Sequence, residues 1–186
     1  MWRKVLVTAS AASLLAFGAI SAAQESDSKV AKERADIDEK AEEGLAEFFD
    51  TVEGGQSLFD KAAGYAIFRV TKAGLGVSGA GGQGVLVNKS SGARTYMNMG
   101  AAGAGLTFGA SRYDIIILFE TAERLAAFQS GGWDSAATAE AAAGTESAGA
   151  GTTFFEGVAY FQVGNSGLMA SADVTGTRFW VSEDLN

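Results

Sequence analysis

The chain has 186 residues, the size of one ordinary domain, and a formal net charge of −8. It contains no cysteine and no histidine, which excludes disulfides, zinc sites built from these residues and catalytic triads that use histidine. A chain this acidic is not expected to bind nucleic acid non-specifically.

The first 23 residues have the features of a signal peptide. Arg3 and Lys4 supply a positive start, residues 5–20 are apolar, and Ser21-Ala22-Ala23 offers small residues for cleavage before Gln24. The apolar run is too short and too rich in small residues for a good membrane span. We therefore expect residues 24–186 to form a single exported domain, periplasmic or secreted, and not a lipoprotein, because no cysteine is available for lipid attachment.

Two helices are predicted at the start of this domain. Residues 28–53 place apolar side chains three, four or seven positions apart along one face: Val30, Ile37, Ala41, Leu45, Phe48 and Val52. Residues 26–28 supply candidate N-caps, and Gly54-Gly55 ends the run. The polar face is acidic, so we expect this helix to dock on its own domain rather than on a membrane. A short second helix is predicted over residues 57–63, with Ser57 as its cap.

Residues 74–79, GLGVSG, match the GxGxxG pattern of dinucleotide-binding folds. That fold needs a helix directly after the glycines, but a strand-like Val85-Leu86-Val87 follows, and the next acidic residue is Asp114. Ser78 fails as a hydrolase nucleophile, because Ala80 replaces the second glycine of the motif and no histidine can act as base. The carboxylate-rich segment 36–44 has Lys40 where a calcium loop needs an oxygen, and it lacks the turn glycine. We expect no enzyme activity, no cofactor and no metal.

Glycines at alternate positions then predict a bent sheet. Gly74 and Gly76 alternate with apolar residues, as do Gly103, Gly105 and Gly109, and such glycines permit tight bending of strands or a close approach to the backbone. A buried strand is expected at 113–119, a capped helix at 121–128, and strands at 153–163, 168–174 and 177–181. Residues 134–151 fit either helix or strand. The expected fold is α+β, with N-terminal helices packed on a strongly curved, glycine-rich antiparallel sheet or small barrel.

Charge is unevenly distributed along the chain. Residues 24–60 and 114–186 each carry a net −8, whereas residues 61–113 contain no acid and six bases. These bases are the candidate anion-binding residues: Lys61, Arg69, Lys72, Lys89, Arg94 and Arg112. Scattered surface charge is the simpler interpretation of the same block, and the sequence leaves both open.

Three segments together resemble the SYLF family, a lipid-binding domain found alone in bacterial envelope proteins. They are AAGYAIFRVTKAGLGVSGAGGQGVLV, the block GAGLTFGASRYDIIILFETAERLAAF, and the C-terminal VAYFQVGNSGLMASADVTG with its closing Asp184-Leu185-Asn186. The likeness covers residues 30–186, with Arg69 where the family usually has proline. It implies lipid binding, with phosphoinositides and, in some fungal members, actin as eukaryotic partners. Actin is not expected for an exported bacterial-type protein.

The leading hypothesis is thus a non-enzymatic lipid-binding protein of the cell envelope. It would contact anionic lipid or a membrane surface peripherally, through the six bases of the glycine-rich strand region. The alternative is an envelope module that binds another protein through an exposed sheet edge, without a specific lipid. A small outer-membrane barrel ranks last, because about eight spanning strands would be needed and the predicted helices leave too little chain.

Overall fold

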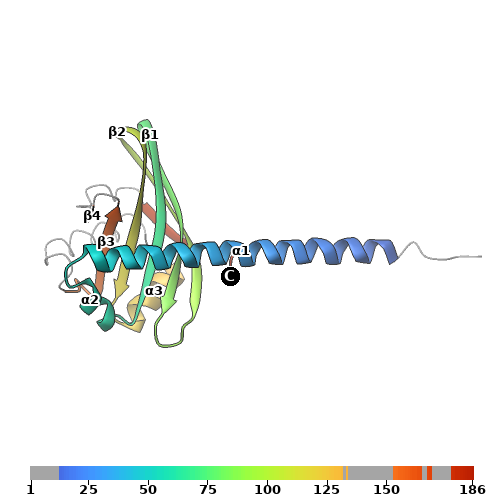
Figure 1. Ribbon diagram of the computed structural model, residues 1–186, viewed down its shortest axis with the longest axis horizontal. Coiled ribbons are helices and arrows are strands. Elements are labelled where there is room, and N and C mark those ends of the chain that lie inside the picture. The colour runs from blue at the N-terminus through green and yellow to red at the C-terminus, as the bar shows by residue number, and fades with distance from the viewer. Residues whose placement is uncertain (1–12, 132, 134–152, 165–166, 169–176) are drawn as a thin grey trace, which may run out of the picture.

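The computed structural model describes residues 13–131, 133, 153–164, 167–168 and 177–186 (Figure 1). For residues 13–24, 75–78, 103–109 and 167–168 the description covers the backbone alone. The elements in chain order are α1 (Ser13–Thr51), α2 (Gly55–Lys61), β1 (Gly64–Asn88), β2 (Arg94–Phe119), α3 (Ala122–Gly131), β3 (Val158–Gly164), β4 (Gly167–Leu168) and β5 (Thr177–Val181). The five strands form one antiparallel sheet in the order β1-β2-β3-β4, with β5 paired to β2.

Helix α1 is much longer than the sequence predicts. It begins at Ser13 rather than at the candidate caps of residues 26–28, and its first half projects away from the sheet (Figure 1). Ser28 does not cap the helix, because its Oγ donates a hydrogen bond to the Glu25 carbonyl three residues earlier. A serine that bonds back to its own helix in this way is compatible with a helix interior, so the predicted start was wrong.

The second half of α1 packs on the sheet through the predicted apolar face. Ile37, Ala41, Phe48 and Val52 are buried, and Val30 and Leu45 are partly buried against the same cluster. The short helix α2 is also present, but it begins two residues before Ser57. Gly54 precedes it with a φ of 77°, a left-handed conformation that glycine adopts without strain.

Strands β1 and β2 form a single long hairpin that bends sharply. The pairing runs from Gly64↔Phe119 to Val87↔Arg94 and shifts register between Leu75 and Val77. Beyond this shift the second half of β1 returns along the first half, since Lys89 N donates to the Ala63 carbonyl at 3.1 Å. The GxGxxG segment therefore lies within a strand, as its sequence context predicts, and the glycine-rich bend is confirmed.

Two apolar clusters cover the two faces of the sheet. On one face α1 and α2 pack on alternate strand residues that include Ile67, Ile116 and Phe161. On the other face α3 buries Leu125 and Phe128 against Phe68 and Phe119. The strict alternation of the strand residues between the two clusters follows from the period of two in a β-strand.

The end of the chain connects α1 to the start of β2. Leu185 is buried, and its carbonyl accepts a hydrogen bond from Arg34 Nε at 2.8 Å. Asn186 Oδ1 accepts from Tyr96 N at 2.9 Å, and its Nδ2 donates to the carbonyls of Tyr96 and Ser182. Tyr96 in turn donates its hydroxyl to Asp38, and burial first, then this hydrogen bond, raises the pKa of Tyr96.

Replacing Asn186 by alanine is expected to lower the free energy of unfolding by about 2 kcal/mol. The change removes three hydrogen bonds, and the half-buried Tyr96 amide loses its acceptor. Chemical denaturation of the purified variant measures this loss. Asn88, which caps the exposed hairpin turn through its own side chain, offers a matched asparagine control. An Asn186→Ala effect no larger than that of Asn88→Ala would contradict the prediction.

The α+β fold with N-terminal helices packed on a curved antiparallel sheet is confirmed. The sheet does not close into a barrel within the residues described, so of the two expected alternatives the open curved sheet is present and the small barrel is not. The helix at 121–128, the buried strand at 113–119 and the strand at 177–181 are present as α3, the end of β2 and β5. Residues 134–151 and 169–174 lie outside the described part of the chain. No helix in the part that is described has the length and apolarity needed to cross a membrane.

Candidate functional site

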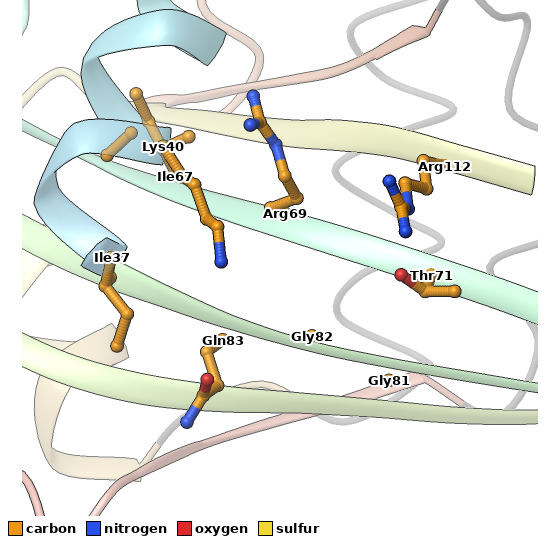
Figure 2. Close-up of a pocket in the computed structure, with 10 residues that line it drawn as sticks. Ile37, Lys40, Ile67, Arg69, Thr71, Gly81, Gly82, Gln83 and Arg112 are labelled. Atoms are coloured by element: carbon orange, nitrogen blue, oxygen red, sulfur yellow. The ribbon is translucent and has the colours of Figure 1, made fainter. Parts of the chain in front are cut away.

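A groove of about 520 Å³ lies between α1 and the two halves of β1 (Figure 2). Helix α1 contributes Ile37, Lys40 and Ala41, and the remaining lining comes from the hairpin: Ile67, Arg69, Thr71, Gly81, Gly82, Gln83 and Arg112. Figure 2 shows Arg69 and Thr71 on one strand, Arg112 on the neighbouring strand, and Gly81 and Gly82 on the strand that returns. The groove thus combines three cationic side chains with exposed glycine backbone.

Glycine makes this groove possible because two stretches of backbone approach closely at its floor. A Cβ placed on Gly82 would lie 2.4 Å from the Arg69 carbonyl oxygen, a distance much shorter than real Cβ atoms show to their neighbours. Gly82 therefore permits the close approach of the two halves of β1, which is an architectural role for a strand glycine.

Arg69 is the most strongly engaged base in the groove. Its Nε and Nη2 donate to the two carboxylate oxygens of Asp114 at 2.9 and 2.8 Å, and its Nη1 donates to Glu43 at 2.7 Å. The hydrogen bond to Asp114 is the main cause that raises the pKa of Arg69. Asp114 is buried beneath α1, where a Cβ on Gly44 would lie 2.6 Å from its Oδ2. Arg69 therefore neutralises a buried carboxylate and holds α1 on the sheet.

Arg112 differs from Arg69 in having no carboxylate partner among the described residues. It stands opposite Thr71 in the β1–β2 register and is exposed. It also lines a second hollow of about 270 Å³, together with Arg69, Asp114 and Glu47. The third cation, Lys40, forms an ion pair with Asp36 one turn earlier on α1. Arg112 is thus the guanidinium of the groove whose donors are available to a ligand.

The other four predicted bases do not line the groove. Lys72 lies next to it on β1, opposite Ser111 in the register. Lys61 is exposed at the end of α2. Lys89 donates to the carbonyls of Phe59 and Asp60 and lies over the Phe59 ring, and Arg94 forms an ion pair with Asp38 at 2.6 Å. Of the six candidates, the structure brings Arg69 and Arg112 together, with Lys72 as a neighbour.

Three polar groove residues were not predicted from sequence: Lys40, Thr71 and Gln83. Lys40 belongs to the acidic helix, and Gln83 lies in the glycine run, where its Nε2 donates to Glu33 at 2.7 Å. Lys40 carries a usable signal, because it stands three positions after Ile37 and one before Ala41 and so flanks the apolar face that docks on the sheet.

The chemistry available in the groove is that of anion binding. A guanidinium presents several N–H donors in a planar fork that matches phosphate and carboxylate oxygens. Gly81 and Gly82 carry no side chain that would keep a ligand away from the strand. No residue pair in the groove has the arrangement of a nucleophile and its base.

Comparison with known proteins gives two matches. A family model described as "Ysc84: Las17-binding protein actin regulator" matches residues 100–186. The chain is also 37% identical over 158 residues to a protein named Beta cell expansion factor A from Aeromonas veronii. That alignment covers 84% of this chain and 60% of the relative, so the chain spans less than two thirds of the relative's length.

Proposed function

The chain belongs to the SYLF family, which the Ysc84 model represents and of which the Aeromonas veronii relative is a member. On this premise we propose that it is a non-enzymatic lipid-binding protein of the cell envelope. The family is linked to lipid binding and is not a family of enzymes. The sequence of residues 1–23, with the features of an export signal, supports the envelope as the location.

The observation that carries the proposal is the groove with its available guanidinium. Arg112 is exposed beside Gly81 and Gly82, whereas the charge of Arg69 is already balanced by Asp114 and Glu43. A phosphate group of an anionic lipid fits the donors of Arg112 in charge and in geometry. The proposed lipid-binding site therefore contains fewer residues than the six bases expected from the sequence. It is centred on Arg112, and Arg69 and Lys72 lie next to it.

Vesicle flotation tests this function. The protein is expected to float with vesicles of phosphatidylglycerol and phosphatidylcholine, and not with pure phosphatidylcholine. Binding is expected to be modest, because the mature chain carries a net −10 once Arg3 and Lys4 are removed. It should weaken with added salt, since screening acts over about 10 Å at 0.1 M. Equal flotation with both vesicles, or with neither, would contradict anionic lipid binding.

Replacing Arg112 by glutamine is expected to reduce the affinity for the anionic vesicles about fivefold. One base near an anionic surface contributes about 1 kcal/mol, which corresponds to that factor. Lys61→Gln is the matched control, because it removes one positive charge from an exposed position outside the groove. We expect the control to change affinity less than twofold. Equal losses in the two variants would mean that net charge, and not the groove, governs binding.

A second candidate function, protein binding through a sheet edge, is favoured by strand β5. Within the described residues the one strand that pairs with β5 is β2, while Phe179 N on β5 also donates to the Trp133 carbonyl at 2.9 Å, and Trp180 is 48% exposed. An exposed tryptophan on an edge strand is a common feature of protein contacts. Size-exclusion chromatography with light scattering of wild type and Trp180→Ala tests self-association by this edge. A monomer in both cases would contradict pairing of this edge with a second copy of the chain.

A further inference from the structure

The bent end of the β1–β2 hairpin has no charged side chain. We call residues 73–80 of β1 and 101–110 of β2 the apolar tip. Between Lys72 and Lys89, and between Arg94 and Arg112, the sequence contains no Asp, Glu, Lys or Arg. Within the tip only Ser78 and Thr107 are polar, and the rest is glycine, alanine and four larger apolar residues: Leu75, Val77, Leu106 and Phe108. Figure 1 shows this end of the hairpin extending to the side opposite α2 and α3.

Four of the seven tip residues whose side chains are described are open to solvent, whereas Gly74, Ala80 and Ala101 are partly buried and the two alanines pack against the apolar cluster that includes Met99. Ala73, Gly79, Ala102 and Ala110 are exposed, and a Cβ added at Gly79 would meet no atom within 4 Å. The backbone is nevertheless paired on both sides of the bend, with Ala73 opposite Ala110 and Gly79 opposite Ala102, whereas Gly76 and residues 105–107 fall in the register shift and have no partner in the register. The tip is thus an apolar, protruding element in which the facing backbone groups on either side of the bend are satisfied, which lowers the cost of leaving water.

Positive charges stand where the apolar tip begins. Arg112 is opposite Thr71, and Lys72 is opposite Ser111, so the two cations extend from opposite faces of the hairpin. Long basic side chains at the edge of an apolar surface place their charged ends among lipid phosphates while their stems remain in apolar surroundings. The pair therefore forms a basic collar around the base of the tip.

We propose that the apolar tip inserts into the outer part of an anionic lipid bilayer while Lys72 and Arg112 contact the phosphates. This inference rests on the proposed lipid-binding function and adds the way in which the membrane is engaged. The four residues from Ala73 to Gly76 extend about 13 Å beyond the collar at about 3.3 Å per residue. That length passes the head groups and enters the hydrocarbon, but it is less than half of the roughly 30 Å hydrocarbon core.

The composition of the tip fits a lipid surface better than a protein partner. Binding energy between proteins is concentrated in tryptophan, tyrosine and arginine, and the tip contains none of them. The acidic helix α1 does not share this end of the hairpin, because its docked half packs near Ile67 and Ile116 (Figure 1). The tip can therefore approach an anionic surface with its basic collar directly behind it and with the acidic helix away from the lipid.

The absence of cysteine permits a direct test with a single labelled site. Gly79→Cys places a nitrobenzoxadiazole probe on the tip, and Gly131→Cys places it at the end of α3, where an added Cβ also meets nothing within 4 Å. With vesicles of phosphatidylglycerol and phosphatidylcholine, the fluorescence emission of the probe at position 79 should shift to the blue. Lipid that is spin-labelled at carbon 5 should quench this emission. The probe at position 131 should show neither change.

The outcomes separate this inference from the function on which it rests. Flotation of the labelled Gly79→Cys protein with unchanged probe emission would overturn tip insertion and leave lipid binding intact. No flotation of either labelled protein or of wild type would overturn both. Equal quenching at positions 79 and 131 would also overturn insertion by the tip, because the whole molecule would then enter the bilayer.

A charge placed on the tip supplies an independent test. Gly79→Asp is expected to bind the anionic vesicles about fivefold less tightly than Gly79→Asn, which has the same shape without the charge. The corresponding pair at Gly131 should differ less than twofold. Equal affinities for Gly79→Asp and Gly79→Asn would contradict entry of the tip into the bilayer.

Discussion

Replacing Arg69 by glutamine is expected to lower the free energy of unfolding by about 3 kcal/mol, as measured by chemical denaturation. Asp114 lies under α1 with 5% of its side chain exposed, and both its oxygens accept hydrogen bonds from Arg69. Removing the guanidinium leaves that carboxylate buried without its cation. We take the lower end of the usual range because the Arg69 side chain remains 28% exposed. The ion pair to Glu43 adds little, since Glu43 is 60% exposed.

Two further variants test whether the buried Asp114 carboxylate causes the loss of stability in Arg69→Gln. Adding Asp114→Asn to Arg69→Gln removes the unpaired charge, so the double variant should be more stable than Arg69→Gln alone. Arg112→Gln changes the neighbouring arginine, which has no carboxylate partner in the described chain, and should alter stability by less than about 0.5 kcal/mol. A loss in Arg112→Gln equal to that in Arg69→Gln would contradict this account of the pair.

Replacing Gly84 by alanine is expected to lower the free energy of unfolding by about 3 kcal/mol, an effect as large as that of Arg69→Gln. A Cβ at this position would lie 2.1 Å from the Ile67 carbonyl oxygen and 2.5 Å from the Phe68 ring. Both neighbours are held in the sheet, so the two halves of β1 would have to separate, and overpacking of this kind typically costs 1–3 kcal/mol. Thermal and chemical denaturation measure the loss.

Gly79→Ala is the matched control for this change. It adds the same methyl group to the same strand, where nothing lies within 4 Å, and it should leave stability unchanged or raise it slightly. If Gly84→Ala and Gly79→Ala had equal stability, the close approach of the two halves of β1 would be contradicted.

Local patterns in the sequence predicted most of the described elements and the main helix face, although the strand expected at 153–163 begins only at Val158. The spacing of Ile37, Ala41 and Phe48 identified the side of α1 that docks on the sheet, because helical periodicity is expressed within a few turns. Alternating glycines predicted a bent antiparallel sheet for a similarly local reason. The predicted start of α1 was wrong because the preference of residues 26–28 for a helix cap is weak compared with the tendency of a helix to continue.

The grouping of the bases could not be predicted without the strand register. The hairpin reverses at residues 88–93, which places Lys89 and Arg94 at the end remote from Arg69 and Arg112. The pairing of Arg69 with Asp114 joins residues 45 positions apart, and it depends on the pairing of β1 with β2. An acid-free block in the sequence therefore does not become one basic surface in the fold.

The most direct test of the central claim is a nuclear magnetic resonance titration with short-chain phosphatidylglycerol below its micelle concentration. If the groove between α1 and the hairpin binds an anionic lipid head group, the amide signals of Gly81, Gly82 and Arg112 should shift. The same lipid with a phosphatidylcholine head group should leave them unchanged. Shifts that are absent, equal for the two lipids, or centred on Lys89 and Arg94 would contradict the assignment of this groove as the lipid-binding site.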